Sequence, residues 1–419
     1  MVKSLAKYLG FGKRSGQTST LGSPAYWLRN AIGGGVSETG ITVNANNSLG
    51  VTAVWRAVKI ISEGIAGLDK GVFSKDSDGN TIEKNTHYLN KLLTEPYDRY
   101  TGFTFFESMQ ANACLRGNAY AAIIRDESGR PINLVMINPS FVSVMFDTNR
   151  NFYYQVTNDK HEVEIVYPDD ILHIPSLVLE SDHIVGKSPI QVHRESLGLS
   201  LATTKYASRF FKNGAHVSGY LSTDGSLKPD AAQRMAESWR RRFGGINNVG
   251  KTPVLEEGLK YYPLSLNPQD AMFVETHRLN VEDVSRIFGV PAHMLSSLDR
   301  ATFSNIEHQS REYVTHTLTP WARRWEAELK RKLVPERDKS RMSILFNMDS
   351  LLRGDSESRA KLIDTYMKWG VLNRDEIRRM EGFNDIEDGS GKKYYVPLNM
   401  TDGAENINEN GEGNEIITE

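Results

Sequence analysis

The sequence predicts an α+β protein built from more than one compact unit. Apolar residues recur every three to four positions in several stretches, which is the period of an amphipathic helix. Elsewhere, short β-rich runs alternate with Gly, Pro, Asn and Asp turns at short intervals. The chain of 419 residues is also long enough for roughly two to three units of about 150 residues each.

The part of the chain from residue 51 to residue 174 is predicted to form helices followed by strands. A helical pattern begins at residue 51, and further helices are predicted over 88–94 and 103–116. The β-rich runs then follow at 118–125, 134–137, 142–146, 152–156, 162–167 and 171–174. Turn residues separate these runs, so we expect a compact antiparallel β unit.

Two long helices flank an insertion in the middle of the chain. Ser188 and Gln191 have the spacing of a capping box, with Pro189 at the first helical position, so a helix is predicted over 188–214. A second helix is predicted over 267–290, ending at Gly289. Between them, residues 215–266 are predicted to form a small α/β module with a strand, a helix that begins after Pro229 and a strand pair.

The last third of the chain is predicted to be mainly helical. Ser304 and Glu307 open a long helix, which Pro320 is expected to bend. A strand is predicted over 343–348, followed by helices that begin at Asp355 and Asn373.

The two ends of the sequence lack helical or strand periodicity. Residues 1–49 are rich in Gly, Ser, Thr and Asn, and we expect an irregular or mobile arm. Residues 401–419 contain six carboxylates and no basic residue, so an acidic, disordered tail is expected.

Composition limits the class of protein. Fifty basic and 52 acidic residues give a net charge of −2, whereas proteins that grip phosphate backbones usually carry a basic excess, so tight DNA binding is disfavoured. Cys114 is the only cysteine, so no intramolecular disulfide can form. No run reaches ~18 apolar residues and the apolar core of a signal peptide is missing. We therefore expect a soluble protein that is neither secreted nor membrane-spanning and that assembles in a reducing cytoplasm.

Six short segments carry further information because of their order along the chain. They are LRGNAY at 115–120, GKSP at 186–189, FFKNG at 210–214, VLEEG at 254–258, RIFGVP at 286–291 and LRGD at 352–355. Each segment alone is weakly diagnostic. Together they resemble the compact family of tailed-bacteriophage portal proteins, and the resemblance spans roughly residues 50–400.

The resemblance implies the portal fold and a division of the chain into named regions. Residues 50–187 would form an α/β wing that contains the antiparallel unit, and 304–350 would add a long helix and a strand to it. The stem helices would be 188–214 and 267–290, with the inserted module 215–266 as the clip. Residues 291–303 would be a tunnel loop and 351–400 a helical crown.

The resemblance also implies a function and partners. Twelve subunits would form a ring at one capsid vertex of the virion, through which double-stranded DNA is packaged and ejected. The terminase large subunit, the head-tail connector and the major capsid protein would dock on this ring. No catalytic activity, cofactor, metal or membrane contact is expected. Two alternative hypotheses for the function are a nucleotide hydrolase and another structural component of the virion.

The nucleotide hydrolase reading comes from one motif. Residues 245–252, GINNVGKT, match the phosphate-binding pattern G-x-x-x-x-G-K-[ST]. Phosphate binding requires a strand before this loop and a helix after it, because the helix N-terminus faces the phosphates. Here a predicted helix with Trp239 and Phe243 precedes the loop and a strand follows. The inverted context argues against a nucleotide site.

Two groups of residues are candidates for contact with DNA or with partners. The clip cluster comprises Arg240, Arg241, Arg242 and Lys251, which could contact DNA or acidic partners, or could simply be a solvated helix end. The tunnel-loop group comprises Ser296, Ser297, Asp299, Arg300 and Thr302, whose hydroxyls and charges could touch passing phosphates. The family position of the loop favours the functional reading.

Other chemically active residues have simpler interpretations. The histidines are scattered and none belongs to an H-E-x-x-H arrangement, so packing or surface roles are expected rather than metal binding. Asp169 and Asp170 follow a proline in a predicted turn. Cys114 lies on a predicted helix among apolar neighbours, so a buried structural thiol is expected rather than a nucleophile. Trp321 and Trp325 have the spacing of core residues on another predicted helix, with a contact between subunits as the alternative.

Overall fold

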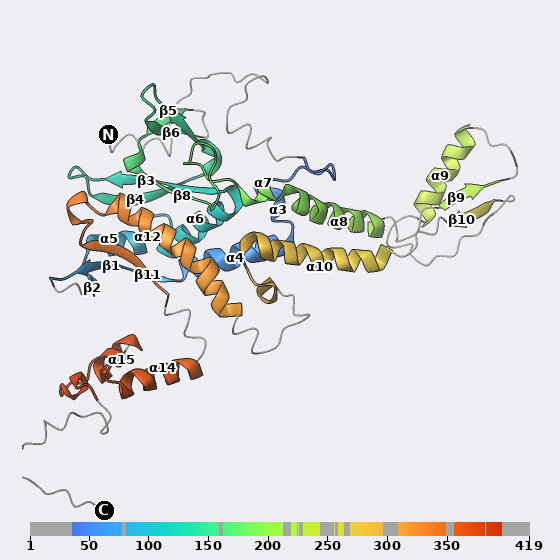
Figure 1. The fold of residues 1–419 in the computed structure, drawn as a ribbon. Helices are drawn as coiled ribbons and strands as arrows, with labels where there is room; N and C mark the ends of the chain where they lie inside the picture. The colour runs from blue at the N-terminus through green and yellow to red at the C-terminus, as the bar shows by residue number, and fades with distance from the viewer. Residues whose placement is uncertain are drawn as a thin grey trace, which may run out of the picture. The chain divides into compact units, whose positions relative to one another are not determined.

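A computed structural model describes residues 36–77, 81–158, 162–212, 219–223, 225, 229–243, 255, 259–263, 269–295, 309–348, 356–381 and 383–395. The chain divides into two compact units, residues 1–348 and 349–419. Among the described residues, no helix is long and apolar enough to cross a membrane. The mixed helices and small antiparallel sheets match the predicted α+β class (Figure 1).

Three helices form the centre of the larger unit (Figure 1). These are α4 (Thr52–Ala66), α6 (Gly102–Arg116) and α12 (Thr319–Leu333), and they share one apolar core with the inner faces of two sheets. Trp325 is fully buried there, with its ring centroid 5.0 Å from that of Phe106. Its indole Nε1 donates to Oε1 of Gln110, which is also fully buried, at 2.9 Å. The predicted core position of Trp325 is confirmed, whereas Trp321 is only partly buried.

Nine strands of this unit form three antiparallel sheets. The first joins β1 (Asp69–Lys75), β2 (Thr81–Glu83) and β11 (Met342–Asn347) in the order β11-β1-β2. The second joins β3 (Asn118–Arg125), β4 (Pro131–Ile137) and β8 (Ile171–Pro175) in the order β4-β3-β8. The third joins β5 (Val142–Phe146), β6 (Phe152–Thr157) and β7 (Val163–Val166) in chain order. The predicted antiparallel unit is confirmed, but it is divided between two sheets.

Strand β3 is buried on both faces, which explains its almost unbroken apolar sequence. Ala119, Ala121 and Ile123 belong to the helical core, whereas Tyr120 and Ile124 belong to a second core against the β5-β6-β7 sheet. Side chains alternate between the two faces of a strand, so one strand serves both cores. Each β3 residue from 118 to 124 is buried.

The segment before α4 differs from the predicted arm. Residues 36–48 form a turn closed by a bridge between Val36 and Thr42, followed by the short helix α3 (Ala45–Ser48). Asn44 caps this helix through a capping box with Asn47, because both side chains bond to the other residue's backbone N–H. An irregular arm over the whole of 1–49 is therefore wrong for 36–48, and residues 1–35 lie outside the described part.

The smaller unit contains the helices α14 (Ser356–Lys368) and α15 (Arg374–Met380). The short helix α5 (Tyr88–Thr94) belongs to the larger unit. The predicted capping box of Asn373 with Glu376 is confirmed. Asp375 is fully buried and its Oδ1 accepts the backbone N–H of Ile386 at 2.9 Å. The capped helix and this bond hold the following turn against α15. Asp355 and the acidic tail 401–419 lie outside the described residues.

Candidate channel and assembly surfaces

Two of the six sequence segments meet at one joint, the glycine joint, formed by residues 115–118, Ser176 and residues 186–188. Gly117 has φ +79°, and a Cβ on Gly186 would lie 2.2 Å from the Gly117 carbonyl oxygen. The buried Asn118 side chain accepts the N–H of Gly186 and donates to its carbonyl oxygen, both at 2.7 Å. The two backbones therefore touch at a point where only glycine fits.

The helix that leaves this joint begins as predicted but is interrupted. Ser188 Oγ accepts the N–H of Gln191 at 3.3 Å and donates to the Leu115 carbonyl at 2.7 Å, so the N-cap is also an anchor to α6. Helix α7 (Pro189–Val192) ends at His193, and α8 (Arg194–Lys212) continues from there. The predicted single helix over 188–214 is therefore two helices, and residues 213 and 214 lie outside the described part.

Helix α8 packs beside α10 (Gln269–Phe288), and the two run alongside each other in Figure 1. Ser196 Oγ donates to Oδ2 of Asp283 on α10 at 2.7 Å. The guanidinium of Arg286 bonds to Oδ1 of Asp283 at 2.8 Å and to Oε2 of Glu282 at 3.1 Å. One arginine thus serves two carboxylates, and this part of α10 carries no basic excess.

The α8–α10 pair leaves apolar side chains in solvent. Leu199 and Tyr206, seven residues apart on one face of α8, are 47% and 53% exposed, and Leu279 on α10 is 48% exposed. Leu197 of α8 and Val284 of α10, by contrast, are buried in the apolar core of the larger unit. Both helices of the pair therefore carry large apolar side chains that the subunit itself does not cover.

The end of α10 corrects the predicted tunnel loop. Gly289, with φ +67°, ends the helix, and residues Ala292–Leu295 form a 3-10 turn rather than open loop. Leu295 is buried, and the Arg56 side chain donates from Nε to the Met294 carbonyl at 3.2 Å. Residues 292–295 of the predicted loop 291–303 therefore form a packed turn. The tunnel-loop candidates Ser296, Ser297, Asp299, Arg300 and Thr302 all lie outside the described residues.

The inserted module has the predicted strand and helix. Strand β9 (Gly219–Ser222) pairs antiparallel with β10 (Lys260–Pro263), and Trp239 of α9 (Pro229–Phe243) stacks on Tyr261 with ring centroids 5.3 Å apart. Arg240, Arg241 and Arg242 lie in the last turn of α9, and the Arg241 side chain is exposed. Lys251 lies outside the described part, so the structure does not bring the clip cluster together.

The phosphate-loop motif follows a helix and precedes a strand, and this order disfavours nucleotide binding. Helix α9 ends at Phe243, immediately before residues 244–254, which lie outside the described part. The first regular element described after them is strand β10. A phosphate loop needs a strand before it and a helix after it.

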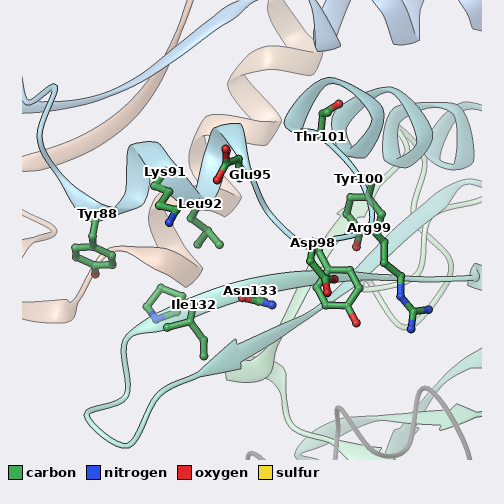
Figure 2. A pocket seen from close by; sticks show the side chains of 12 residues that line it. Tyr88, Lys91, Leu92, Glu95, Asp98, Arg99, Tyr100, Thr101, Ile132 and Asn133 are labelled. Carbon is green, nitrogen blue, oxygen red and sulfur yellow. The ribbon is translucent and has the colours of Figure 1, made fainter.

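A groove on the larger unit lies between α5 and the start of β4 (Figure 2). Its volume is about 820 Å³, and its walls carry Lys91, Glu95, Asp98 and Arg99, so positive and negative charges balance. Tyr100 OH donates to the Leu134 carbonyl at 2.8 Å and accepts the Met136 N–H at 2.9 Å. Burial raises the pKa of Tyr100 to about 12, so this phenol is a structural link rather than an acid or base.

His173 and Asp170, for which packing and turn roles were predicted, both have hydrogen-bond or ion-pair partners. His173 is buried between Tyr154 OH, 3.1 Å from Nδ1, and Asn118 Oδ1, 2.9 Å from Nε2. Burial lowers the pKa of His173 to about 3, so the ring stays neutral. Asp170 pairs with Arg125 at 3.0 Å in a turn, as predicted.

Cys114 is buried, as predicted, and burial raises the pKa of its thiol to about 12. A protonated, inaccessible thiol is a poor nucleophile. In the part of the chain that the structure describes, no three His, Cys, Asp or Glu side chains are placed to hold a metal ion.

Comparison with known proteins gives the family of this chain. Residues 52–382 match the family described as phage portal protein. The chain is 32% identical over 377 residues to a probable portal protein of Streptomyces phage phiC31, covering 88% of this chain and 82% of that protein. It is 28% identical over 364 residues to the portal protein of Enterobacteria phage HK97, covering 85% of each.

The chain therefore belongs to the phage portal protein family, a family of structural, non-enzymatic proteins of the virion. The family predicted from the six segments is confirmed. Solved structures show the same fold. An HK97-family phage portal protein from Corynebacterium diphtheriae aligns with a TM-score of 0.55 at 18% identity, covering 74% of this chain and 97% of that one. A chain from the neck of a native gene transfer agent particle computed with C12 symmetry aligns at 0.56 and 21%, covering 86% and 100%.

Proposed function

We propose that twelve copies of this chain form a ring at one capsid vertex, and that the ring is the channel for double-stranded DNA during packaging and ejection. Family membership carries the proposal, and the likeness to a neck chain computed with C12 symmetry supports the ring. The regions follow the same division: a wing at 50–187 and 304–350, stem helices at 188–214 and 267–290, a clip at 215–266, a tunnel loop and a crown at 351–400.

The α8–α10 pair supplies a physical basis for the ring. A closed ring requires one heterologous contact repeated around an axis, in which two different surfaces of the subunit meet. Among the described side chains of the pair, the large apolar ones that are exposed are Leu199 and Tyr206 on α8 and Leu279 on α10. Burying them against the next subunit would remove apolar area from water, which favours association.

The charge of the chain suits a channel through which DNA slides. Each phosphate that a basic side chain neutralises adds affinity by releasing counterions, so a basic lining would hold DNA in place. The net charge is −2, and Arg286 on α10 is already paired with two carboxylates. The terminase large subunit and the head-tail connector would dock on the clip, with the major capsid protein around the ring.

Ring formation is tested with the full-length chain and two charged variants of α8. The wild-type chain is expected to give channelled rings in negative-stain class averages and a mass of twelve subunits. Leu199→Asp and Tyr206→Asp should leave folded, unassembled subunits, because a buried carboxylate in the contact is costly. Ser208→Asp, an exposed polar position on the same helix, should still form rings. A monomeric wild-type chain, or rings of both charged variants, would contradict the proposal.

The tunnel loop is tested separately. Replacing residues 296–300 with a glycine-serine linker should preserve rings and their incorporation into particles, while lowering the amount of DNA packaged or retained. The reason is that Asp299 beside Arg300 allows brief phosphate contacts without the cumulative affinity of a basic stripe. Genome length and retention are measured in otherwise normal particles, and wild-type values for both would refute this role of the loop.

A further inference from the structure

A π-helical turn interrupts the long helix that follows the predicted tunnel loop. Residues Val314–Leu318 form this turn, in which the Thr319 N–H bonds to the Val314 carbonyl five residues back instead of four. Pro320 follows immediately, at the start of α12. Proline has no N–H and its ring clashes with the carbonyl four residues earlier, so the wider turn accommodates it. A π turn, which holds one residue more than a regular helical turn, thus directly precedes the segment with Pro320.

The extra residue aligns two buried side chains with α4. Tyr313 and Leu318 are five residues apart, which would place them about 140° apart around a regular α-helix. Both nevertheless lie over Gly64: a Cβ there would come 2.9 Å from Leu318 Cδ2 and 3.4 Å from the Tyr313 hydroxyl. The Tyr313 hydroxyl also donates to the Ile60 carbonyl at 3.2 Å. The π turn is therefore fixed in position against α4.

This position directs Thr317 toward the end of α10. Thr317 is buried, and its Oγ1 donates to the Gly289 carbonyl at 2.6 Å. A Cβ on Gly289 would come 2.9 Å from the same Oγ1, and the residue has φ +67°. The Val290 N–H bonds back to Ser285 at 3.2 Å, which closes the C-terminal turn of α10 around the glycine.

The same region ties down both ends of the segment between α10 and the following helix. The Arg56 side chain bonds to the Met294 carbonyl, as described above. His293 Nδ1 lies 2.7 Å from Oε1 of Gln309, the first described residue of the following helix. The helix that enters this region and the helix that leaves it are thus joined at two points, by Thr317 to Gly289 and by His293 to Gln309.

We propose that Thr317 is a positioning residue, which holds the C-terminal end of stem helix α10 in register with the wing and so sets where the tunnel loop begins. The inference rests on the proposed function, because the loop matters only if the chain conducts DNA. No role in ring closure is assigned to Thr317, since its buried side chain contacts the subunit's own α10.

The test compares four single substitutions in the full-length chain, three in the helix that contains the π turn and Gly289→Ala at the end of α10. Thr317→Val has nearly the same shape but leaves the Gly289 carbonyl without its donor, whereas Thr317→Ser keeps the donor. Thr319→Val is the matched control, because Thr319 Oγ1 donates to the Val314 carbonyl within its own helix at 2.8 Å and makes no bond to α10. Hydrogen exchange of residues 285–295, ring formation and DNA retained per particle are measured for each.

Thr317→Val is expected to form rings, to exchange about tenfold faster across residues 285–295, and to retain less DNA than wild type. Thr317→Ser and Thr319→Val should match wild type in all three measurements. Gly289→Ala disturbs the same joint from the α10 side and should reproduce the Thr317→Val result. Wild-type exchange and retention in Thr317→Val would overturn the inference, as would equal losses in Thr319→Val. Failure of wild-type rings would instead count against the proposed function.

Discussion

Replacing Gly186 with alanine is expected to disrupt the glycine joint and to lower the free energy of unfolding by roughly 3 kcal/mol or more. The new Cβ would lie 2.2 Å from the Gly117 carbonyl oxygen and 2.6 Å from the Ser176 backbone nitrogen. Both neighbours are backbone atoms, so relief requires one strand end to move. That movement would separate Ser176 N–H from the Gly117 carbonyl, a bond of 2.8 Å, and break the paired bonds of Asn118.

Gly129→Ala is the matched control for this prediction. Gly129 lies in the β3–β4 turn with φ +77°, and no atom lies within 4 Å of a Cβ placed there. Its substitution should cost only the left-handed backbone strain, about 1–2 kcal/mol. Denaturant and thermal unfolding of both variants provide the comparison. Equal stability of the two variants would show that the Gly186 contact relaxes freely.

Trp325→Ala is expected to lower the free energy of unfolding by at least about 4 kcal/mol. The change removes the largest fully buried side chain of the helical core and leaves a cavity beside Phe105 and Phe106. It also leaves Oε1 of the fully buried Gln110 without the indole donor at 2.9 Å.

Two further substitutions separate the cavity from the lost hydrogen bond. Trp325→Phe keeps most of the ring volume but removes the N–H, so it should cost about 1–3 kcal/mol. Trp55→Ala, at a side chain that is 57% exposed, should change stability by less than about 1 kcal/mol. Unfolding curves that place all three variants together would contradict the packing described for Trp325.

Periodicity predicted the elements whose pattern is local. The helix from residue 51, the helices near 88–94 and 103–116 and the strands from 118 to 174 are all present within a few residues, because each buries one stripe or face. Strand β1 was not predicted. Its sequence contains Gly71 and alternates poorly, and its partner β11 lies far along the chain, so the pairing that stabilises it is not visible locally.

Other features depended on contacts that a linear pattern does not contain. The break at His193 follows a well-formed N-cap and leaves the apolar spacing intact. The turn Ala292–Leu295 was expected to be exposed loop, but Met294 and Leu295 pack against the core. Gly117 and Gly186 belong to two of the six family segments, and only the structure shows that they contact each other. The burial of Thr317 was not predicted, because the helix prediction assumes a regular α-helical period and the π turn changes that period.

The double burial of β3 has a mechanical consequence. A strand with one solvated face can slide relative to its neighbours once the opposite core loosens, whereas β3 is gripped by side-chain packing on both faces and by hydrogen-bonded strands on both edges. Shear between the two cores must therefore break all of these contacts together. Because β3 starts at the glycine joint, load applied to the helices beyond Ser188 enters a strand that is held on both faces and both edges.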